Sequence, residues 1–294
     1  MAQTQQVISC INFNAETKII PIVSSGDKIA GSLRDHGGKS LFTKELDQAL
    51  LNGEIDLAVH SMKDVETPLP EGLVIAAVPM REDPRDVLIY QPGLKLGNLP
   101  LKTTIGTSSL RRTYQLNYYL KNIEIVPCRG NIQTRLQKYS DGEMSGIILA
   151  VAGLKRMGLF GKGKIHGINA QTQILDPTKY VPAAGQGALV IIKRSDDHRF
   201  DAALAKLNHP PSRKAVEIER QVVEALNVTC HDPIGVYAII EDEMQLQVML
   251  FEKNNPPGSA PIFMETSATL LNAHLNIQLL LENIKKACEF GKSL

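Results

Sequence analysis

The sequence has little that would direct it to a membrane or a nucleic acid. Its 294 residues include no tryptophan and only 5% aromatic residues, and the formal net charge is +1. A chain with this balance has no global attraction for polyanions and no interleaved basic and aromatic surface, so we expect no nucleic-acid partner. No apolar run approaches the roughly 20 residues that a membrane-spanning helix needs, so we expect no membrane partner either.

Cysteine is scarce, and no targeting signal is visible. The amino-terminal segment M-A-Q-T-Q-Q-V-I has neither the basic segment nor the apolar core of a signal peptide, which predicts a cytoplasmic protein. The four cysteines at positions 10, 128, 230 and 288 lack C-x-x-C spacing, which argues against a disulfide framework and a structural metal site. His231 beside Cys230 is a weak exception. We therefore expect no metal, and the chain length favours two or three domains.

The stretch D-L-A-V-H-S-M-K-D-V, residues 56–65, is the most informative in the chain. Its alternating pattern predicts a strand that ends near His60 and delivers the next residues to the carboxyl edge of a sheet, where open α/β sheets hold ligands. The Asp64 carboxylate could balance an organic cation there while Lys63 holds an anionic group. An isolated Lys-Asp pair is more often a solvated turn, so this interpretation depends on residues further along.

The elements around that stretch predict a mostly parallel sheet with helices on its faces. Residues 18–24 and 73–78 read as strands, and a helix is predicted from Ser40. The glycine-rich, charged residues 26–39 between them could form a lid over a ligand cleft. The charged segment 80–85 could be a hinge between domains.

Two consecutive strand-to-helix junctions each supply arginines. The first is T-S-S-L-R-R, residues 107–112, and the second runs from Cys128 to Arg135. Helix amino termini favour anions, and guanidinium groups form forked hydrogen bonds with carboxylates. Any one of these arginines could simply be solvated, but four together favour an anion site. Phosphate, carboxylate or nucleic-acid backbone would each satisfy them, and the near-neutral total charge counts against the last.

The second half of the chain returns to the first sheet and then adds a further domain. Residues 146–151 predict a buried strand, followed by a short helix that places Lys155 and Arg156 outward. Residues 182–193 begin as a turn with Gly185 and Gly187 and become a strand that could return to the first sheet. The rest predicts a small α+β domain with Cys230 in a loop, built from a helix at 211–227, strands at 234–240, 245–251 and 262–266, and a helix at 270–288.

Eight motifs occur in order over nearly the whole chain, and together they are far more specific than any one alone. They are G-G-K-S-L-F-T-K-E-L (37–46), A-V-H-S-M-K-D-V (58–65), R-E-D-P-R-D (81–86), G-T-S-S-L-R-R (106–112), R-G-N-I-Q-T-R-L (129–136), L-A-V-A-G-L-K-R-M-G-L (149–159), P-A-A-G-Q-G-A (182–188) and C-H-D-P-I-G-V-Y-A (230–238). The set resembles the porphobilinogen deaminase family, also called hydroxymethylbilane synthase.

The resemblance implies an α/β fold with two lobes like those of periplasmic binding proteins and a small α+β carboxyl-terminal domain. The expected boundaries are 1–80 with 182–206, 85–181, and 210–294. It also implies a transferase that joins four molecules of porphobilinogen head to tail with loss of ammonia, giving hydroxymethylbilane for tetrapyrrole (porphyrin and heme) biosynthesis. The family works as a monomer, and we expect the same here.

The resemblance further assigns roles to residues of this sequence. Asp64 is expected to be catalytic, and a dipyrromethane cofactor is expected as a thioether on Cys230. Lys39 and Arg156 are expected to bind substrate. The residues expected to bind the cofactor, besides Cys230, are Lys63, Ser109, Arg111, Arg112, Arg129, Arg135 and Gln186.

Three departures from the family pattern qualify these expectations. The first strand, with the family's R-I-x-T-R-x-S-x-L-A pattern, has no counterpart before Met1, so we expect a truncated or impaired protein. Asp35 stands where many members have lysine, and Val228-Thr229 replaces the usual Gly-Gly before the cofactor cysteine. The alternative reading is therefore a catalytically silent two-lobed anion-binding protein of the same fold.

Overall fold

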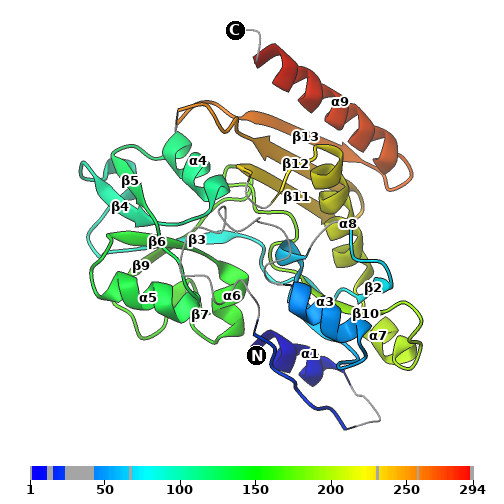
Figure 1. The fold of residues 1–294 in the computed structure, drawn as a ribbon. Coiled ribbons are helices and arrows are strands. Elements are labelled where there is room, and N and C mark those ends of the chain that lie inside the picture. Colours follow the sequence, from blue (N-terminus) through cyan, green and yellow to red (C-terminus); the bar gives the residue numbers. More distant parts are fainter. Residues whose placement is uncertain are drawn as a thin grey trace.

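The structure, a computed structural model, describes residues 2–11, 16–23, 43–65, 68–229, 232–256 and 258–291. The expected lid, with Asp35 and Lys39, and the cysteine expected to carry the cofactor, Cys230, lie outside these ranges. Helices and strands together form a mixed α/β fold with three main sheets, which confirms the predicted fold class (Figure 1). Within the described ranges, no helix combines the length and apolar character needed to span a bilayer.

The first sheet has three strands with helices on both faces. In spatial order its strands are β1 (Ala58–Ser61), β10 (Leu189–Arg194) and β2 (Leu73–Ala77). The covering helices are α1 (Ala2–Cys10), α3 (Lys44–Leu51) and α7 (Asp201–Leu207). Leu50 of α3 packs on one face with Ala58 and Val190, whereas Val7 of α1 and Leu204 of α7 pack on the other. Because both faces are covered, β10 is apolar over almost its whole length.

The second sheet lies next to the first and has five strands. In spatial order they are β5 (Ile123–Val126), β4 (Thr103–Gly106), β6 (Gly146–Ala150), β3 (Asp86–Tyr90) and β9 (Gln171–Ile174). Its helices are α4 (Leu110–Tyr119), α5 (Ile132–Ser140) and α6 (Val151–Arg156). Leu116 of α4 packs on one face, whereas Leu136 of α5 and Leu154 of α6 pack on the other. A small hairpin of β7 (Phe160–Gly161) and β8 (Lys164–Ile165) follows α6.

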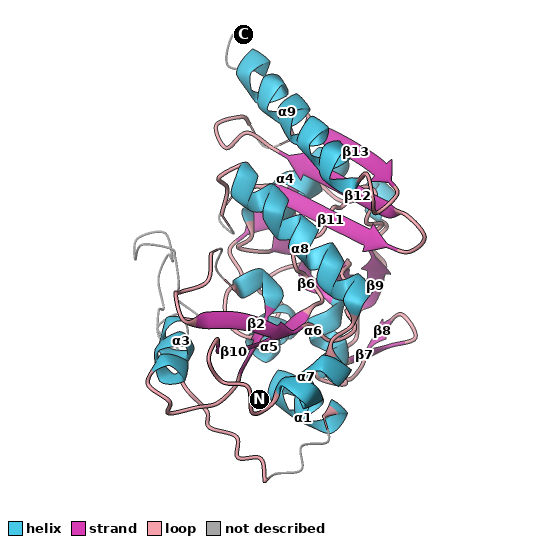
Figure 2. Cartoon of the chain, turned by 90° about the vertical axis from the view of Figure 1, so that its right-hand side faces the viewer, coloured by secondary structure: helices cyan, strands magenta, loops and turns pink. Residues whose placement is uncertain are grey.

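The third sheet is an antiparallel meander. Its strands are β11 (Ile234–Ile240), β12 (Met244–Leu250) and β13 (Ile262–Ala268), and its helices are α8 (Pro210–Ala225) and α9 (Ala273–Gly291). Ile218 and Val222 of α8 share the core of this sheet, but Val216 of the same helix packs in the core of the first sheet. Helix α8 therefore joins the two sheets, as Figure 2 shows.

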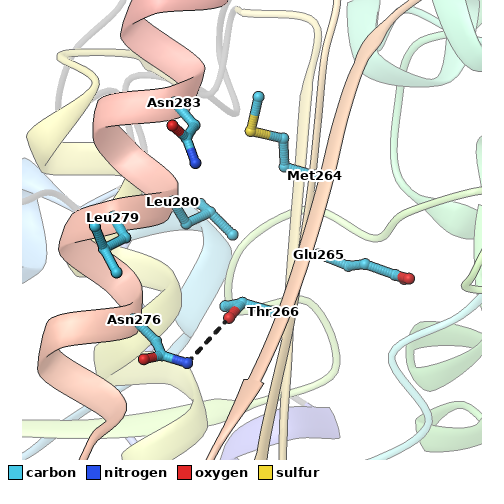
Figure 3. Close-up of a pocket in the computed structure, with 7 residues that line it drawn as sticks. All are labelled: Met264, Glu265, Thr266, Asn276, Leu279, Leu280 and Asn283. Carbon is cyan, nitrogen blue, oxygen red and sulfur yellow. Dashed lines mark hydrogen bonds between the residues drawn. The ribbon is translucent and has the colours of Figure 1, made fainter.

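A pocket of about 250 Å³ lies between β13 and α9 (Figure 3). Asn276 donates a hydrogen bond from its amide to the Thr266 hydroxyl, 3.4 Å away, at one end of it. No residue that the sequence predicts for catalysis or binding lines this pocket. No group of three or more His, Cys, Asp or Glu side chains in the described part of the chain is arranged to hold a metal ion.

Several predicted elements need correction. The first sheet is antiparallel rather than mostly parallel, because β10 enters from the second sheet and pairs with β1 and β2 in the opposite direction. Residues 18–23, predicted as a strand, have no regular structure, and Ile20 and Val23 are 47% and 60% exposed. A strand needs a neighbour for its backbone groups, and no described strand pairs with this segment. Strand β9 and helix α7 were not predicted.

Candidate active site

The predicted Lys-Asp turn is anchored by the residues on either side of it. Strand β1 ends at Ser61, and the chain then makes a short helical turn, η2 (Met62–Asp64). Met62 and Val65 are buried in the core of the first sheet. The amide of Gln3 in α1 donates to the Ser61 hydroxyl, 2.8 Å away. The turn is thus fixed at both ends while the side chains of Lys63 and Asp64 stay accessible to solvent.

The surrounding protein changes the protonation behaviour of both side chains. Desolvation raises the pKa of Asp64 above its ordinary value, and the neighbouring Lys63 opposes part of this rise. Desolvation also lowers the pKa of Lys63. Both side chains remain accessible, so this desolvation comes from protein packed around the turn rather than from complete burial. Perturbed groups in such a position are typical of functional sites.

Arg111 and Arg112, in the first turn of α4, are buried and share one carboxylate. The Nη2 atoms of Arg111 and Arg112 donate to the two oxygens of Asp86, each 2.7 Å away. Arg111 also donates to the Val181 carbonyl at 2.9 Å, and Arg112 to the Ile148 carbonyl at 3.2 Å. Lys63 lies close enough for electrostatic interaction with both arginines and with Asp86. The two predicted clusters are therefore adjacent in space.

The arginine pair keeps unused donors. The Nε atoms of both Arg111 and Arg112 are buried and have no hydrogen-bond partner. A buried N–H group without an acceptor is costly, so these two atoms suit an anionic ligand that supplies one.

Arg129 and Arg135, at the second junction, extend the same positive region. Asn131 caps α5 by accepting a hydrogen bond from the Thr134 backbone N–H at 2.8 Å. Arg135 donates from Nε to the Gly130 carbonyl, 2.7 Å away. Burial, followed by the nearby positive charges of Arg112 and Arg129, lowers the pKa of Arg135. Arg135 of the second junction therefore lies within electrostatic reach of Arg112 of the first.

The loop 182–188 packs directly behind the Lys63-Asp64 turn. Gln186 is buried and donates to the Pro84 carbonyl at 2.6 Å and to Asp86 at 2.9 Å. Gly185 has a φ of +72°, and a Cβ at this position would lie 2.6 Å from Met62 Cγ and 3.0 Å from the Lys63 backbone nitrogen. Only glycine fits both this backbone conformation and this close approach. The sequence signal G-x-G was weak alone, but here it marks a real close contact.

Arg156 is not turned outward as predicted. It is half-buried, with Nη2 donating to the Gly187 carbonyl at 2.5 Å and Nε to the Gln6 side chain at 3.2 Å. Lys155 is exposed as predicted, and it pairs with Glu82 at 2.8 Å. Helix α6 lies beside both the segment 80–85 and α1, and the half-buried arginine follows from that packing.

Three further predicted site residues occupy different situations. Ser109 is half-buried at the amino-terminal cap of α4 without a capping hydrogen bond from its side chain. Lys39 and Cys230 lie outside the described residues. On either side of the undescribed residues 230 and 231, the Thr229 backbone N–H and hydroxyl donate to Asp232 at 2.7 and 2.9 Å. Val228, one of the departures from the family pattern, packs against the core of the third sheet.

Asp86 was missed as a site residue, although it closes the quoted motif R-E-D-P-R-D. It begins strand β3 and contacts both arginines and Gln186. Local sequence could not reveal these contacts, because the partners of Asp86 lie 25, 26 and 100 residues away.

Comparison with known proteins gives a consistent result. The family profile described as porphobilinogen deaminase, dipyromethane cofactor binding domain, matches residues 1–202. The porphobilinogen deaminase of Moorella thermoacetica is 46% identical over 229 residues, covering 76% of this chain and 70% of the relative. That of Bacillus subtilis is 42% identical over 272 residues, covering 90% and 83%. The chain belongs to the porphobilinogen deaminase family.

A solved structure of a periplasmic arginine-binding transport protein from Legionella pneumophila aligns with this porphobilinogen deaminase family member at 17% identity. The alignment covers 64% of this chain and 72% of that chain, with a TM-score of 0.33. A likeness of this size supports no inference about architecture, and the family assignment depends on the sequence relatives.

The residues present fit the dipyrromethane cofactor of the porphobilinogen deaminase family. A dipyrromethane built from porphobilinogen units carries acetate and propionate groups, which are anions. The cluster offers the positive groups of Lys63, Arg111, Arg112, Arg129 and Arg135 against the two carboxylates of Asp64 and Asp86. The excess positive charge and the unused Nε donors match the carboxylates of such a group.

Proposed function

We propose that this chain joins four molecules of porphobilinogen head to tail, releases ammonia at each addition, and frees the product as hydroxymethylbilane. The observation that supports the proposal is the turn Lys63-Asp64, which lies within electrostatic reach of the buried pair Arg111 and Arg112. It places one carboxylate for a developing cation next to several cations for carboxylates.

Asp64 stabilises the positive charge that forms on the substrate. When the C–N bond of the aminomethyl group breaks, its electron pair leaves with the ammonia and a positive charge stays on the substrate pyrrole. The Asp64 carboxylate accepts a hydrogen bond from the pyrrole N–H and stabilises that charge. Desolvation also raises its pKa above the ordinary value of a carboxyl group.

The cations divide the remaining work. Lys63, Arg111, Arg112, Arg129 and Arg135, with Ser109 and Gln186, hold the cofactor. When bound, the dipyrromethane supplies the pyrrole chain that each substrate extends. Arg156 and Lys39 bind the incoming carboxylates, since each added ring brings an acetate and a propionate. Arg156 reaches this position beside Gly187 and α1, where burial lowers its pKa and favours an anionic partner.

The cofactor is attached to Cys230 as a thioether. The thiolate is the form that adds to an electrophilic pyrrole methylene, and an adjacent histidine such as His231 favours that form.

We assign the chain to three domains, 1–80 with 182–206, 85–181, and 210–294. The three sheets support this division, because each is formed within one of these units. We also infer a cytoplasmic monomer that acts without nucleic acid.

The proposal is tested by mass spectrometry and turnover. Protein purified from cells that make porphobilinogen should be heavier than its sequence by one dipyrrole, carried on the peptide with Cys230. Peptides with Cys10, Cys128 and Cys288 serve as internal controls and should be unmodified. Cys230→Ser should lack the added mass, and the wild-type protein should consume porphobilinogen and release ammonia.

Two results would change the conclusion. Unmodified protein without turnover, even after hydroxymethylbilane is supplied, would reject the enzyme and favour the silent anion-binding reading. If a form extended at the amino terminus then gained the dipyrrole, the family's first strand would be required for activity.

A further inference from the structure

Asp86 is a deeply buried charged group that the proposed function leaves without a task. It is 1% exposed and lies at the start of β3. One carboxylate oxygen accepts from Arg112 and from Gln186 at 2.7 and 2.9 Å, and the other accepts from Arg111 at 2.7 Å. All three side chains that reach it are donors, so only an acceptor of this shape satisfies them together.

Charge explains why an anion is needed at this point. Arg111 and Arg112 lie side by side in the interior, with Lys63 close enough to repel both and Arg135 close enough to repel Arg112. Without a counter-ion the pair would carry two buried positive charges. With Asp86 the pair carries a net charge of one. The carboxylate accepts hydrogen bonds from the Nη2 atoms of both arginines, while both Nε atoms have no partner.

We propose that Asp86 is a positioning residue for the cofactor site. It is the internal counter-anion that holds Arg111 and Arg112 side by side. The pair keeps one net positive charge and two unused Nε donors for a ligand carboxylate. This inference rests on the proposed function. Through Gln186, Asp86 also ties the arginine pair to the loop that packs behind Lys63. The loop 182–188 therefore contacts both the Asp86 carboxylate that holds the arginine pair and the backbone of Lys63.

The test compares variants of Asp86 in the full-length protein. Asp86→Asn keeps the shape of the side chain but removes its charge, and its amide N–H would face the donors that Asp86 accepts from. Asp86→Glu keeps the charge. Asp86→Ala opens a space that formate can fill, whereas formamide has a similar size but no charge. The matched control is Asp83→Asn, three residues earlier, which removes a pair with Arg85 at 2.7 Å but does not contact the arginine pair.

We expect Asp86→Asn to reduce the fraction of protein carrying the cofactor at least tenfold, and Asp86→Glu to recover part of it. Formate should restore cofactor uptake to Asp86→Ala and raise its thermal midpoint more than it raises that of the wild type. Formamide should do neither, and Asp83→Asn should take up cofactor like the wild type.

Normal cofactor uptake by Asp86→Asn would overturn the inference, as would equal rescue of Asp86→Ala by formate and formamide. If Asp86→Asn fails to fold, the midpoint of Asp86→Ala in formate decides, and an increase no larger than that of the wild type would overturn it. A wild-type protein without turnover rejects the proposed function, while the formate response still tests Asp86 separately.

Discussion

Replacing Glu219 by glutamine is expected to destabilise the protein strongly. Glu219 lies in α8, is 0% exposed, and accepts four hydrogen bonds. Two come from Arg81, at 2.7 and 3.2 Å, and the others come from the backbone N–H groups of Gly185 and Ala238, at 2.6 and 2.8 Å. Every neighbour is a donor, so a glutamine NH₂ group would oppose at least one of them. The contacts join α8, β11, the segment 80–85 and the loop behind Lys63.

The magnitude follows from the burial of the pair. Removing one partner of a buried ion pair costs about 3–5 kcal/mol because the other charge is left without compensation. A domain of this size loses roughly 2–4 °C in thermal midpoint per kcal/mol, so we expect a fall of at least about 6 °C. Turnover should fall as well, because Gly185 packs against the backbone of Lys63.

The matched control is Glu217→Gln in the same helix. Glu217 pairs with Arg213 at 2.9 Å but is 43% exposed. An exposed pair with this spacing contributes about 0.3–0.5 kcal/mol, so the midpoint should change by less than about 2 °C. The assay is thermal unfolding followed by circular dichroism, with ammonia release measured in parallel. Equal shifts for the two variants would refute the reasoning that Glu219 connects these elements.

Four other predictions concern the site. Asp64→Asn should cut turnover at least about 100-fold without lowering the thermal midpoint at neutral pH, because the surroundings disfavour the charged form that the amide replaces; a large loss of stability would contradict this. On acidification, turnover should be lost before the fold, because the raised pKa of Asp64 makes this carboxylate protonate first. Arg111 and Arg112 outweigh the effect of burial and keep the pKa of Asp86 low. The contribution of Asp86 to stability is present above its unfolded pKa and is lost only as pH falls towards the lower folded value. Coincident profiles of kcat/KM and circular dichroism against pH would argue otherwise. Gly185→Ala should lower the free energy of unfolding by about 1–3 kcal/mol and lower kcat. Its control, Gly142→Ala, has a similar φ of +80° but no atom within 4 Å of the added Cβ, so it should lower the free energy of unfolding by about 1 kcal/mol and leave kcat unchanged. Denaturant titrations and steady-state assays measure the two effects. Arg112→Leu should prevent cofactor uptake while Arg156→Leu mainly slows chain extension, which mass spectrometry of the holoprotein and its extended complexes separates.

Local patterns in the sequence determined much of this protein. The alternation before His60 placed the strand β1 and the turn carrying Lys63 and Asp64 close to their observed positions. The spacing of Val216, Ile218 and Val222 likewise predicted α8, and the two arginine-rich junctions predicted neighbouring arginines, such as Arg112 and Arg135. These features depend on neighbours a few residues apart, so the period of the pattern and the type of residue are sufficient to predict them.

Only the tertiary structure decided how distant segments pair. The same apolar pattern suits a strand in either direction, so the sequence could not show that β10 lies antiparallel between β1 and β2. The sequence could not show that Asp86 forms ion pairs with Arg111 and Arg112, because a charged residue gives no local sign of its partner. For the same reason it could not show that Glu219 pairs with Arg81, which is 138 residues away in the chain. Nor did the apolar residues 18–23 reveal that they have no regular structure, since a strand forms only where another backbone supplies its hydrogen bonds.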